Sequence, residues 1–552
     1  MVRNLLFAGS LFFVSIASLS QTIDEAKQLV YYERWNSAED VLKKIIAAQP
    51  DQPEAYYYLG ELYLAQNKVD AAHTIIQQGV QAADKNGMDK KQHSLIYVGQ
   101  THLLLNDGKN EDATKQFDDL LGMTKYKDAS LLEEVARVHI LSPKGDANEA
   151  IQLLEKAAKR DKKNGEIYVL MGDAYRKIED ASNAFKCYNK SIEIDPSLAE
   201  AHHKLGEIFK TQKNPELYID EFTKAITADK SYAPSLLELY NYYFYSGDFQ
   251  KAGEYLDRYI ASADPSVEND YRKADLFFVT KKYPEAMQTA EAIIQAQGDK
   301  AKPRLYKMIA YCNNEEGDSV KALQSINTYF DKEDKKNYVM KDYDLKASLL
   351  ERSGLKNEAA TWYEKAFSLA DKEDQKEQYM RKIALLDKED KDYINEAVWR
   401  EKIFNQAKSA NNVDLFNWGL SLYFAGKYQQ SDTVFGVYAK KYPEQLFGYL
   451  WQARCNMALD TSMELGLAIP YYEKLVEVAL TNKEANRQTL ISAYNYLGGY
   501  EANIKKDYEK ALDYFNKILE IDENNSEALR LTGILKQWIE QQQKDNGKTG
   551  SN

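Results

Sequence analysis

The stretch that decides the fold is YVLMGDAYRKIEDASNAFKCYNKSIEIDP, residues 168–196. Its apolar and aromatic residues recur three and four positions apart, which places them on one face of a helix. Gly172 and Ala184 are small, and small residues allow two helices to cross closely. Pro196 then ends the unit because proline lacks the backbone N–H that a helix needs. The stretch therefore predicts two antiparallel helices, with Tyr188 filling the space beside their crossing point.

The same pattern recurs along most of the chain. The position of Ala184 is taken in other units by Ala38, Ala72, Ala113, Ala150, Ala252, Ala286, Ala322, Ala359 and Ala511, and several of these alanines lie 34 residues apart. The preceding helix carries Y-x2-L-G-x2-Y or a variant of it, as at residues 56–63, 205–209, 418–422 and 494–498. Two helices cannot bury both of their faces alone, so neighbouring units are expected to stack.

These motifs resemble the tetratricopeptide repeat (TPR), whose pattern of W-x2-L-G-x2-Y, A-x3-F and P spans 34 residues. The resemblance implies an all-α fold, a right-handed α-solenoid of antiparallel helix pairs. We expect about 14 pairs within residues 21–525. A capping helix is expected at residues 526–543, with Leu529, Ile534 and Trp538 on one side, followed by a disordered tail at residues 544–552.

Some repeats depart from the pattern. Tyr218 stands at the small twentieth position and Tyr240 at the small eighth position, so we expect wider helix crossings or a bend there. Residues 376–410 fit poorly, because Glu401 occupies a position that should be large and apolar.

Composition agrees with a helical array and excludes one class of partner. The chain of 552 residues has only 11 prolines, and its length alone would have suggested three or four domains. The net charge is −13 and no stripe of Lys or Arg is visible, which argues against nucleic acid as a partner. Many of the 41 tyrosines fall on repeat positions. The repeat pattern does not explain the cluster of Tyr240, Tyr242, Tyr243 and Tyr245. This cluster predicts a partner site or a kink.

The N-terminus has the layout of a secretory signal peptide. Arg3 precedes the short apolar run LLFAGSLFFVSI (residues 5–16), and small residues follow up to Ser20. The run is too short to span a bilayer as a mature helix, and no later segment is apolar enough. We therefore expect residues 1–20 to be cleaved near Ser20, and the protein to be exported to the periplasm. The alternative is an N-terminal anchor or a buried helix.

Catalytic and metal-binding signatures are missing. The sequence has no G-x-S-x-G, H-E-x-x-H or G-x-G-x-x-G, its six histidines are scattered, and its three cysteines stand far apart. The acidic run DKEDKD (residues 387–392) lacks the glycine of a calcium loop. We therefore expect no enzyme activity, no metal and no cofactor.

The TPR resemblance implies that positions 2, 5, 9 and 12 of each first helix face the concave surface. In this chain those positions give Tyr57, Glu61, Asp173, Arg176, His203, Glu207, Asn241 and Phe244. The set is aromatic and acidic, which suits an extended peptide or a helix with basic or apolar residues. It lacks the repeated Lys and Asn with which some TPR proteins hold a C-terminal carboxylate. The alternative is that these residues merely solvate the groove.

The sequence as a whole predicts an exported bacterial multi-TPR scaffold that binds partner proteins in the cell envelope without catalysis. Two alternatives stay open: a structural subunit of a secretion or outer-membrane assembly machine, and a glycan- or peptidoglycan-binding accessory. Asp318-Ser319-Val320 and Asp432-Thr433-Val434 resemble acceptor sequences for O-glycosylation of exported bacterial proteins, with Ser319 and Thr433 as the acceptors.

Overall fold

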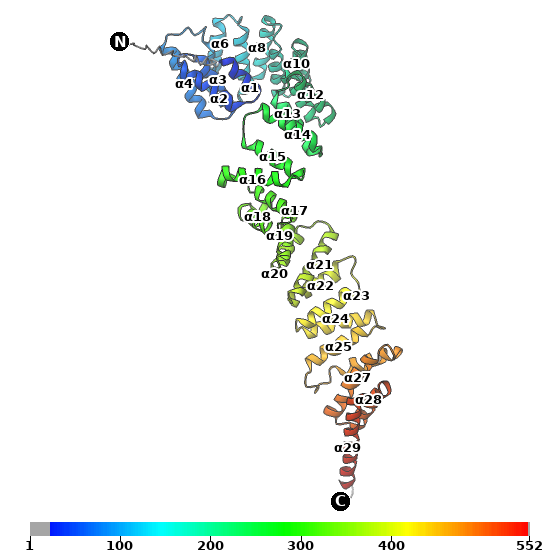
Figure 1. Ribbon diagram of the computed structural model, residues 1–552. Coiled ribbons are helices and arrows are strands. Elements are labelled where there is room, and N and C mark those ends of the chain that lie inside the picture. Colours follow the sequence, from blue (N-terminus) through cyan, green and yellow to red (C-terminus); the bar gives the residue numbers. More distant parts are fainter. Residues whose placement is uncertain (1–21, 550–552) are drawn as a thin grey trace, which may run out of the picture. The chain divides into compact units, whose positions relative to one another are not determined.

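The computed structural model describes residues 22–549, and within that range every regular element is helical (Figure 1). The predicted signal peptide at residues 1–20 lies outside the described residues. None of the helices between residues 22 and 549 is both long and apolar enough to cross a membrane. The chain divides into two compact units, the first ending at Ala296 and the second beginning at Gln297. Gly298, with a φ of 55°, and Pro303 interrupt the helices at this boundary.

Unit 1 contains eight helix pairs. They are α1 (Ile23–Tyr31), α2 (Trp35–Ala48), α3 (Pro53–Ala65), α4 (Val69–Lys85), α5 (Ser94–Asn106), α6 (Asn110–Met123), α7 (Ala129–Leu141), α8 (Ala147–Arg160), α9 (Glu166–Lys177), α10 (Ala181–Ile194), α11 (Ala199–Thr211), α12 (Pro215–Ala228), α13 (Ala233–Ser246), α14 (Phe249–Ser262), α15 (Val267–Val279) and α16 (Tyr283–Gln297).

Unit 2 contains six pairs and a final single helix. They are α17 (Arg304–Glu315), α18 (Ser319–Lys332), α19 (Met340–Arg352), α20 (Lys356–Ser368), α21 (Glu373–Glu389), α22 (Tyr393–Gln406), α23 (Asn412–Phe424), α24 (Tyr428–Lys441), α25 (Leu446–Leu459), α26 (Ile469–Ala479), α27 (Arg487–Tyr500), α28 (Tyr508–Ile521) and α29 (Ser526–Thr549). The prediction of about 14 pairs and a capping helix is confirmed.

The helices of a pair cross where the sequence places its small residues. A methyl group added to Gly206 would lie 2.5 Å from the Phe222 ring, and one added to Gly419 would lie 2.6 Å from Phe435. The alanines at the twentieth position are fully buried, as Ala184 is at 0% exposure. The large residue at the twenty-fourth position therefore packs directly onto the glycine of the preceding helix, as predicted.

The two tyrosines at small positions are accommodated in different ways. Tyr218 is half-buried and packs edge-on against Tyr242 of the next pair, while the crossing at Gly206 stays close. Tyr240 is buried at 4% exposure and packs beside Ala252. The expected wider crossing is therefore wrong at Gly206, because the bulky ring at Tyr218 is directed toward the following pair.

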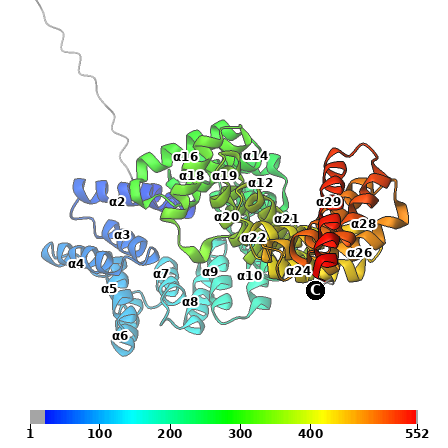
Figure 2. The same cartoon turned by 90° about the horizontal axis from the view of Figure 1, so that it is seen from below.

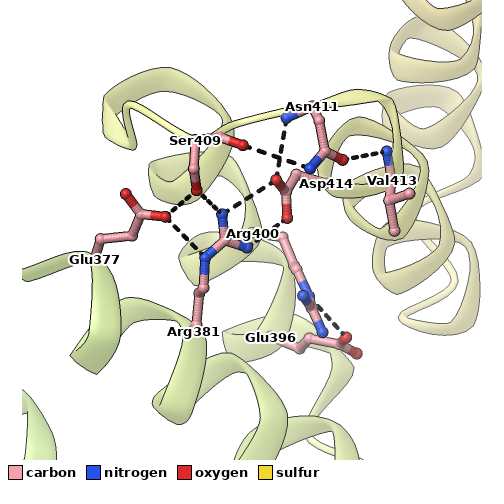
Figure 3. Close-up of polar contacts among 8 residues, drawn as sticks. All are labelled: Glu377, Arg381, Glu396, Arg400, Ser409, Asn411, Val413 and Asp414. Carbon is pink, nitrogen blue, oxygen red and sulfur yellow. Dashed lines mark hydrogen bonds and ion pairs between the residues drawn. The ribbon is translucent and has the colours of Figure 1, made fainter. Parts of the chain in front are cut away.

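The irregular pair α21–α22 shifts its buried residues and adds a polar clamp. Glu401 is exposed, and Trp399 and Ile403 are buried in its place. Arg381 of α21 donates to Asp414 of α23 at 2.7 Å, and it also binds groups on α21 and on the loop that follows α22 (Figure 3). The clamp joins α21 to the next first helix, α23.

The capping helix differs from its prediction in two respects. Its buried residues include Ala528 and Leu535, whereas Leu529 and Trp538 are about half exposed. The helix also runs to Thr549, so residues 544–549 are helical rather than a disordered tail. That polar segment contains no proline to end a helix, and Gly547 alone does not stop it.

Candidate functional site

Two of the residues predicted to face a groove are core residues. Tyr57 is 1% exposed and its hydroxyl donates to Glu134 Oε2 at 2.9 Å. His203 lies 3.0 Å from Ser235 Oγ and packs between the Phe222 and Tyr232 rings. Burial lowers the pKa of His203 to about 4, so this imidazole is neutral at pH 7. Neither side chain is free to bind a partner, and both assignments are wrong.

The physical reason is the close packing of first helices in unit 1. Helix α3 contacts α5, α5 contacts α7, and α7 contacts α9, so each first helix covers part of the preceding one. Figure 2 shows α3, α5, α7 and α9 following one another along an arc. The carboxylate of Glu61 also has a partner within the chain, because it lies 2.9 Å from Nδ1 of His102, which is nearly buried.

Three predicted residues do come together on neighbouring first helices. Arg176 of α9 donates to Glu207 of α11 at 2.5 Å, and Tyr188 donates to Asp173 at 2.6 Å. Lys204 lies 3.6 Å from Asp173 and 3.9 Å from Glu207. The side chains of Arg176 and Glu207 are about one third exposed, so this charged network is accessible to solvent.

The network continues on α7 through residues that sequence reasoning missed. Glu134 lies 3.3 Å from Arg137, and burial raises the pKa of Glu133 to about 7. Burial likewise raises the pKa of Glu200 on α11 to about 7, with Lys204 opposing the shift. Glu133 and Arg137 occupy positions 5 and 9 of their repeat. They were missed because this repeat has Ala136 at the position where the motif has glycine.

We call this surface the acidic face. It comprises six carboxylates and three cations: Glu133, Glu134, Glu166, Asp173, Glu200 and Glu207 with Arg137, Arg176 and Lys204. The carboxylates outnumber the cations two to one, and burial raises the pKa of two of them, Glu133 and Glu200. Such a face attracts cationic groups.

The first repeat closes back onto the seventh pair beside this face. Asp264, in the α14–α15 loop, accepts hydrogen bonds from the backbone N–H of Asn36 at 2.7 Å and of Ser37 at 3.3 Å. It also accepts from Ser37 Oγ at 2.5 Å. Helix α2 has Arg34 as its N-cap, with no capping bond of its own. Asp264 therefore supplies the missing cap of a helix that lies 227 residues earlier.

Aromatic contacts support the same closure. The Tyr31 ring lies 5.1 Å from that of Tyr232, and the Tyr32 hydroxyl donates to Asp229 at 2.8 Å. Between α1 and α2, Glu33 carries a pKa raised by burial, and Lys204 and Glu207 act on its charge. We call residues 31–37 with Asp229, Tyr232 and Asp264 the clasp. The clasp joins the first pair to the α12–α13 and α14–α15 loops, so it closes the first seven pairs on themselves and places Glu33 beside the acidic face.

Asn241 and Phe244 lie apart from the acidic face, on α13. Both are half-buried, and Phe244 packs against Tyr240, Tyr245 and Phe249. Most of the tyrosine surplus is thus part of the packing, since the Tyr243 ring also stacks on Tyr255 at 5.5 Å. Tyr245 is different, because 84% of it is exposed.

The two predicted glycosylation acceptors lie on helices of unit 2. Ser319 begins α18, where Asp318 caps the helix by accepting from the Lys321 N–H at 3.0 Å. Thr433 is exposed in the middle of α24, and its hydroxyl donates to the Gln429 carbonyl at 3.0 Å. Both acceptors stay predictions. In the described part of the chain, no group of three or more His, Cys, Asp or Glu side chains could hold a metal ion.

Comparisons with family models agree with the repeat pattern. Models of the tetratricopeptide repeat match six segments, at residues 29–96, 135–164, 172–213, 237–301, 415–444 and 492–525.

Two curated relatives match parts of the chain. The chain is 22% identical over 237 residues to the DnaJ protein P58IPK homolog of Arabidopsis thaliana, and the match covers 40% of this chain and 49% of that protein. It is 36% identical over 62 residues to the Type IV pilus assembly protein PilF of Pseudomonas aeruginosa, covering 11% of this chain and 25% of PilF. The chain therefore spans about half the length of the first relative and a quarter of the second.

Two solved structures are similar to parts of the chain. The C-terminal part of a TPR repeat-containing protein from Cytophaga hutchinsonii is 26% identical, covering 47% of this chain and 98% of that chain, with a TM-score of 0.29. Yeast Tom70 is 16% identical, covering 76% of this chain and 98% of that chain, with a TM-score of 0.26. The family matches, the recurring motif and the fourteen helix pairs agree: the chain is a member of the tetratricopeptide repeat family.

Proposed function

We propose that this protein is a non-catalytic interaction scaffold whose acidic face binds a basic segment of a partner protein. The observation that carries the proposal is the charge network of unit 1, about one third exposed at Arg176 and Glu207, in which six carboxylates accompany three cations. TPR proteins generally mediate protein–protein interactions, and the charge of this face selects among partners by electrostatic complementarity.

The perturbed carboxyls indicate how such a partner would be held. Glu133 and Glu200 have pKa values of about 7, because burial disfavours their ionised forms. A lysine or arginine placed beside them favours ionisation. Binding would then release protons near pH 7 and weaken as salt screens the attraction.

The test uses a fluorescein-labelled peptide of alternating Lys and Leu, with a Glu–Leu peptide as the reversed-charge probe. Anisotropy titrations on the full chain should show preference for the Lys–Leu peptide. The Glu133→Gln/Glu200→Gln double variant should weaken it by about tenfold, because a charge-assisted hydrogen bond contributes about 1.5 kcal/mol or more. Glu216→Gln is the matched control, since Glu216 is exposed on α12 outside the acidic face.

Equal binding of the two peptides would refute the assignment. Unchanged affinity in the double variant would do the same, provided that its circular dichroism matches the wild type. Tyr57→Ala is unsuitable for this test, because removing a fully buried ring would destabilise unit 1.

The site of action belongs to the same proposal: the bacterial cell envelope, with periplasmic export directed by residues 1–20. Fractionation of cells expressing the chain with and without these residues tests the location, and a cytoplasmic full-length chain would refute it. A role as a subunit of a secretion or outer-membrane assembly machine draws support from the 62-residue match to a pilus assembly protein. Cross-linking in the native envelope distinguishes a permanent assembly from transient partners.

A further inference from the structure

An aromatic cluster in unit 2 carries two lysines that lack carboxylate partners. Phe330, Tyr343 and Trp362 contact one another, with ring centroids 5.5 Å apart for Phe330–Tyr343, 4.7 Å for Phe330–Trp362 and 5.7 Å for Tyr343–Trp362. Lys346 Nζ lies 3.8 Å from the Trp362 centroid and Lys365 Nζ lies 3.6 Å from it. We call these five residues the lysine shelf.

The lysines of the shelf differ from their neighbours. Lys307, Lys356 and Lys382 in the same region each lie within 3.3 Å of a carboxylate. No described carboxylate lies within 4.0 Å of Lys346 or Lys365, although neighbouring acidic groups act on Lys346 from farther away. Two ammonium groups share one indole, which is a weaker partner than a carboxylate.

The surroundings leave this positive charge poorly compensated. Burial and the charge of Lys365 lower the pKa of Lys346 to about 8, while Asp331 and Glu358 oppose the shift. Lys365 is exposed, and burial followed by the charge of Lys335 lowers its pKa as well. An anion bound beside either amine would favour its charged form and so oppose the lowering of its pKa.

We propose that the lysine shelf binds the carboxylate side chains of an acidic peptide segment from a partner protein. A carboxylate can accept a charge-assisted hydrogen bond from the amine of Lys346 or of Lys365, each of which lies over Trp362 without a carboxylate partner. The half-buried rings of Phe330 and Tyr343 offer apolar contact to the methylene groups beside it. A polysaccharide fits less well, because a sugar ring stacks on a free aromatic face and here both ammonium groups lie over the indole. This site is in unit 2 and does not depend on the function proposed for the acidic face.

The test measures binding of a fluorescein-labelled hexaglutamate peptide to the full chain. Lys346→Met and Lys365→Met should each weaken binding by about tenfold. Lys402→Met is the matched control, because Lys402 also lies over a tryptophan, 3.8 Å from the Trp399 centroid, but without a second lysine there. Circular dichroism confirms that the variants fold, and Lys365→Met replaces an exposed residue and not a buried one.

Calorimetry in buffers of different ionisation enthalpy provides a second measurement. At pH 8 about half of the Lys346 amines are neutral, so anion binding should take up about half a proton in the wild type and none in Lys346→Met. Failure of hexaglutamate to bind would overturn the proposal. So would equal losses in Lys402→Met and Lys346→Met, or binding of polygalacturonate in preference to hexaglutamate.

Discussion

Replacing Asp264 with alanine should open the clasp while leaving the rest of unit 1 folded. The carboxylate of Asp264, 10% exposed, accepts from two N–H groups of the first turn of α2 and from Ser37 Oγ. A capping acceptor stabilises a helix by about 1 kcal/mol, and a hydrogen bond to a charged group contributes about 1.5 kcal/mol. The exposed Arg34 contact adds little.

The cost of Asp264→Ala is therefore about 2.5 kcal/mol, which is about seventy-fold in the equilibrium for opening the clasp. Hydrogen exchange measured by mass spectrometry should show faster exchange at the start of α2 and in α1, because their contacts to the α12–α13 loop and to the α14–α15 loop are lost together. Asp264→Asn should cost less, since asparagine is also a good capping residue.

The matched control is Asp248→Ala, because Asp248 caps its own helix, α14, through the Lys251 N–H at 3.2 Å. Faster exchange in this variant should stay within α14. If Asp264→Ala left the protection of residues 31–37 unchanged, the closure would contribute nothing to stability, and the capping argument would be refuted.

Three further predictions concern packing, pH and the polar clamp. Gly206→Ala should lower the free energy of unfolding by about 1–3 kcal/mol through overpacking, whereas Gly499→Ala, with no neighbouring atom within 4 Å, should raise it by about 1 kcal/mol; urea titration checks both. Wild-type unit 1 should lose stability as the pH rises from about 4.5 to 7, because the folded state retains the proton of Glu133 that the unfolded state releases. Glu133→Gln should show a smaller difference in Tm between pH 5 and pH 8. Arg381→Met should cost about 2 kcal/mol, since Asp414, 3% exposed, loses its cationic partner, and urea midpoints measure the loss.

The fold could be predicted because its determinants are local and repeated. In each unit the motif itself marks where the two helices cross, as Gly206 with Phe222 and Gly419 with Phe435 show. The errors in predicting the packing of the pairs occurred where a unit departs from the motif. At α22 the buried residues shift from Glu401 to Ile403, which no single position of the pattern could indicate.

The candidate site was harder to predict because it depends on how pairs stack. The family positions assume that a first helix presents its inner side to solvent, but in unit 1 the next first helix covers Tyr57. The clasp depends on the summed rotation of successive pairs, which single residues do not reveal. One local signal did exist: α2 starts after Arg34, so its first turn needed an acceptor from elsewhere.

The tyrosine excess now has a physical explanation in the charge of the chain. With 85 acidic and 72 basic residues, some carboxylates have no basic partner, and tyrosine can donate to them from a core position where phenylalanine cannot. The Tyr97, Tyr126 and Tyr32 hydroxyls donate to Asp84, Asp118 and Asp229 at 2.8, 2.9 and 2.8 Å, and none of these three carboxylates has an ion-pair partner among the described residues. A tyrosine at a repeat position therefore fills the core with its ring and donates to a carboxylate at the surface with its hydroxyl. This explains why the chain has 41 tyrosines and only 19 phenylalanines.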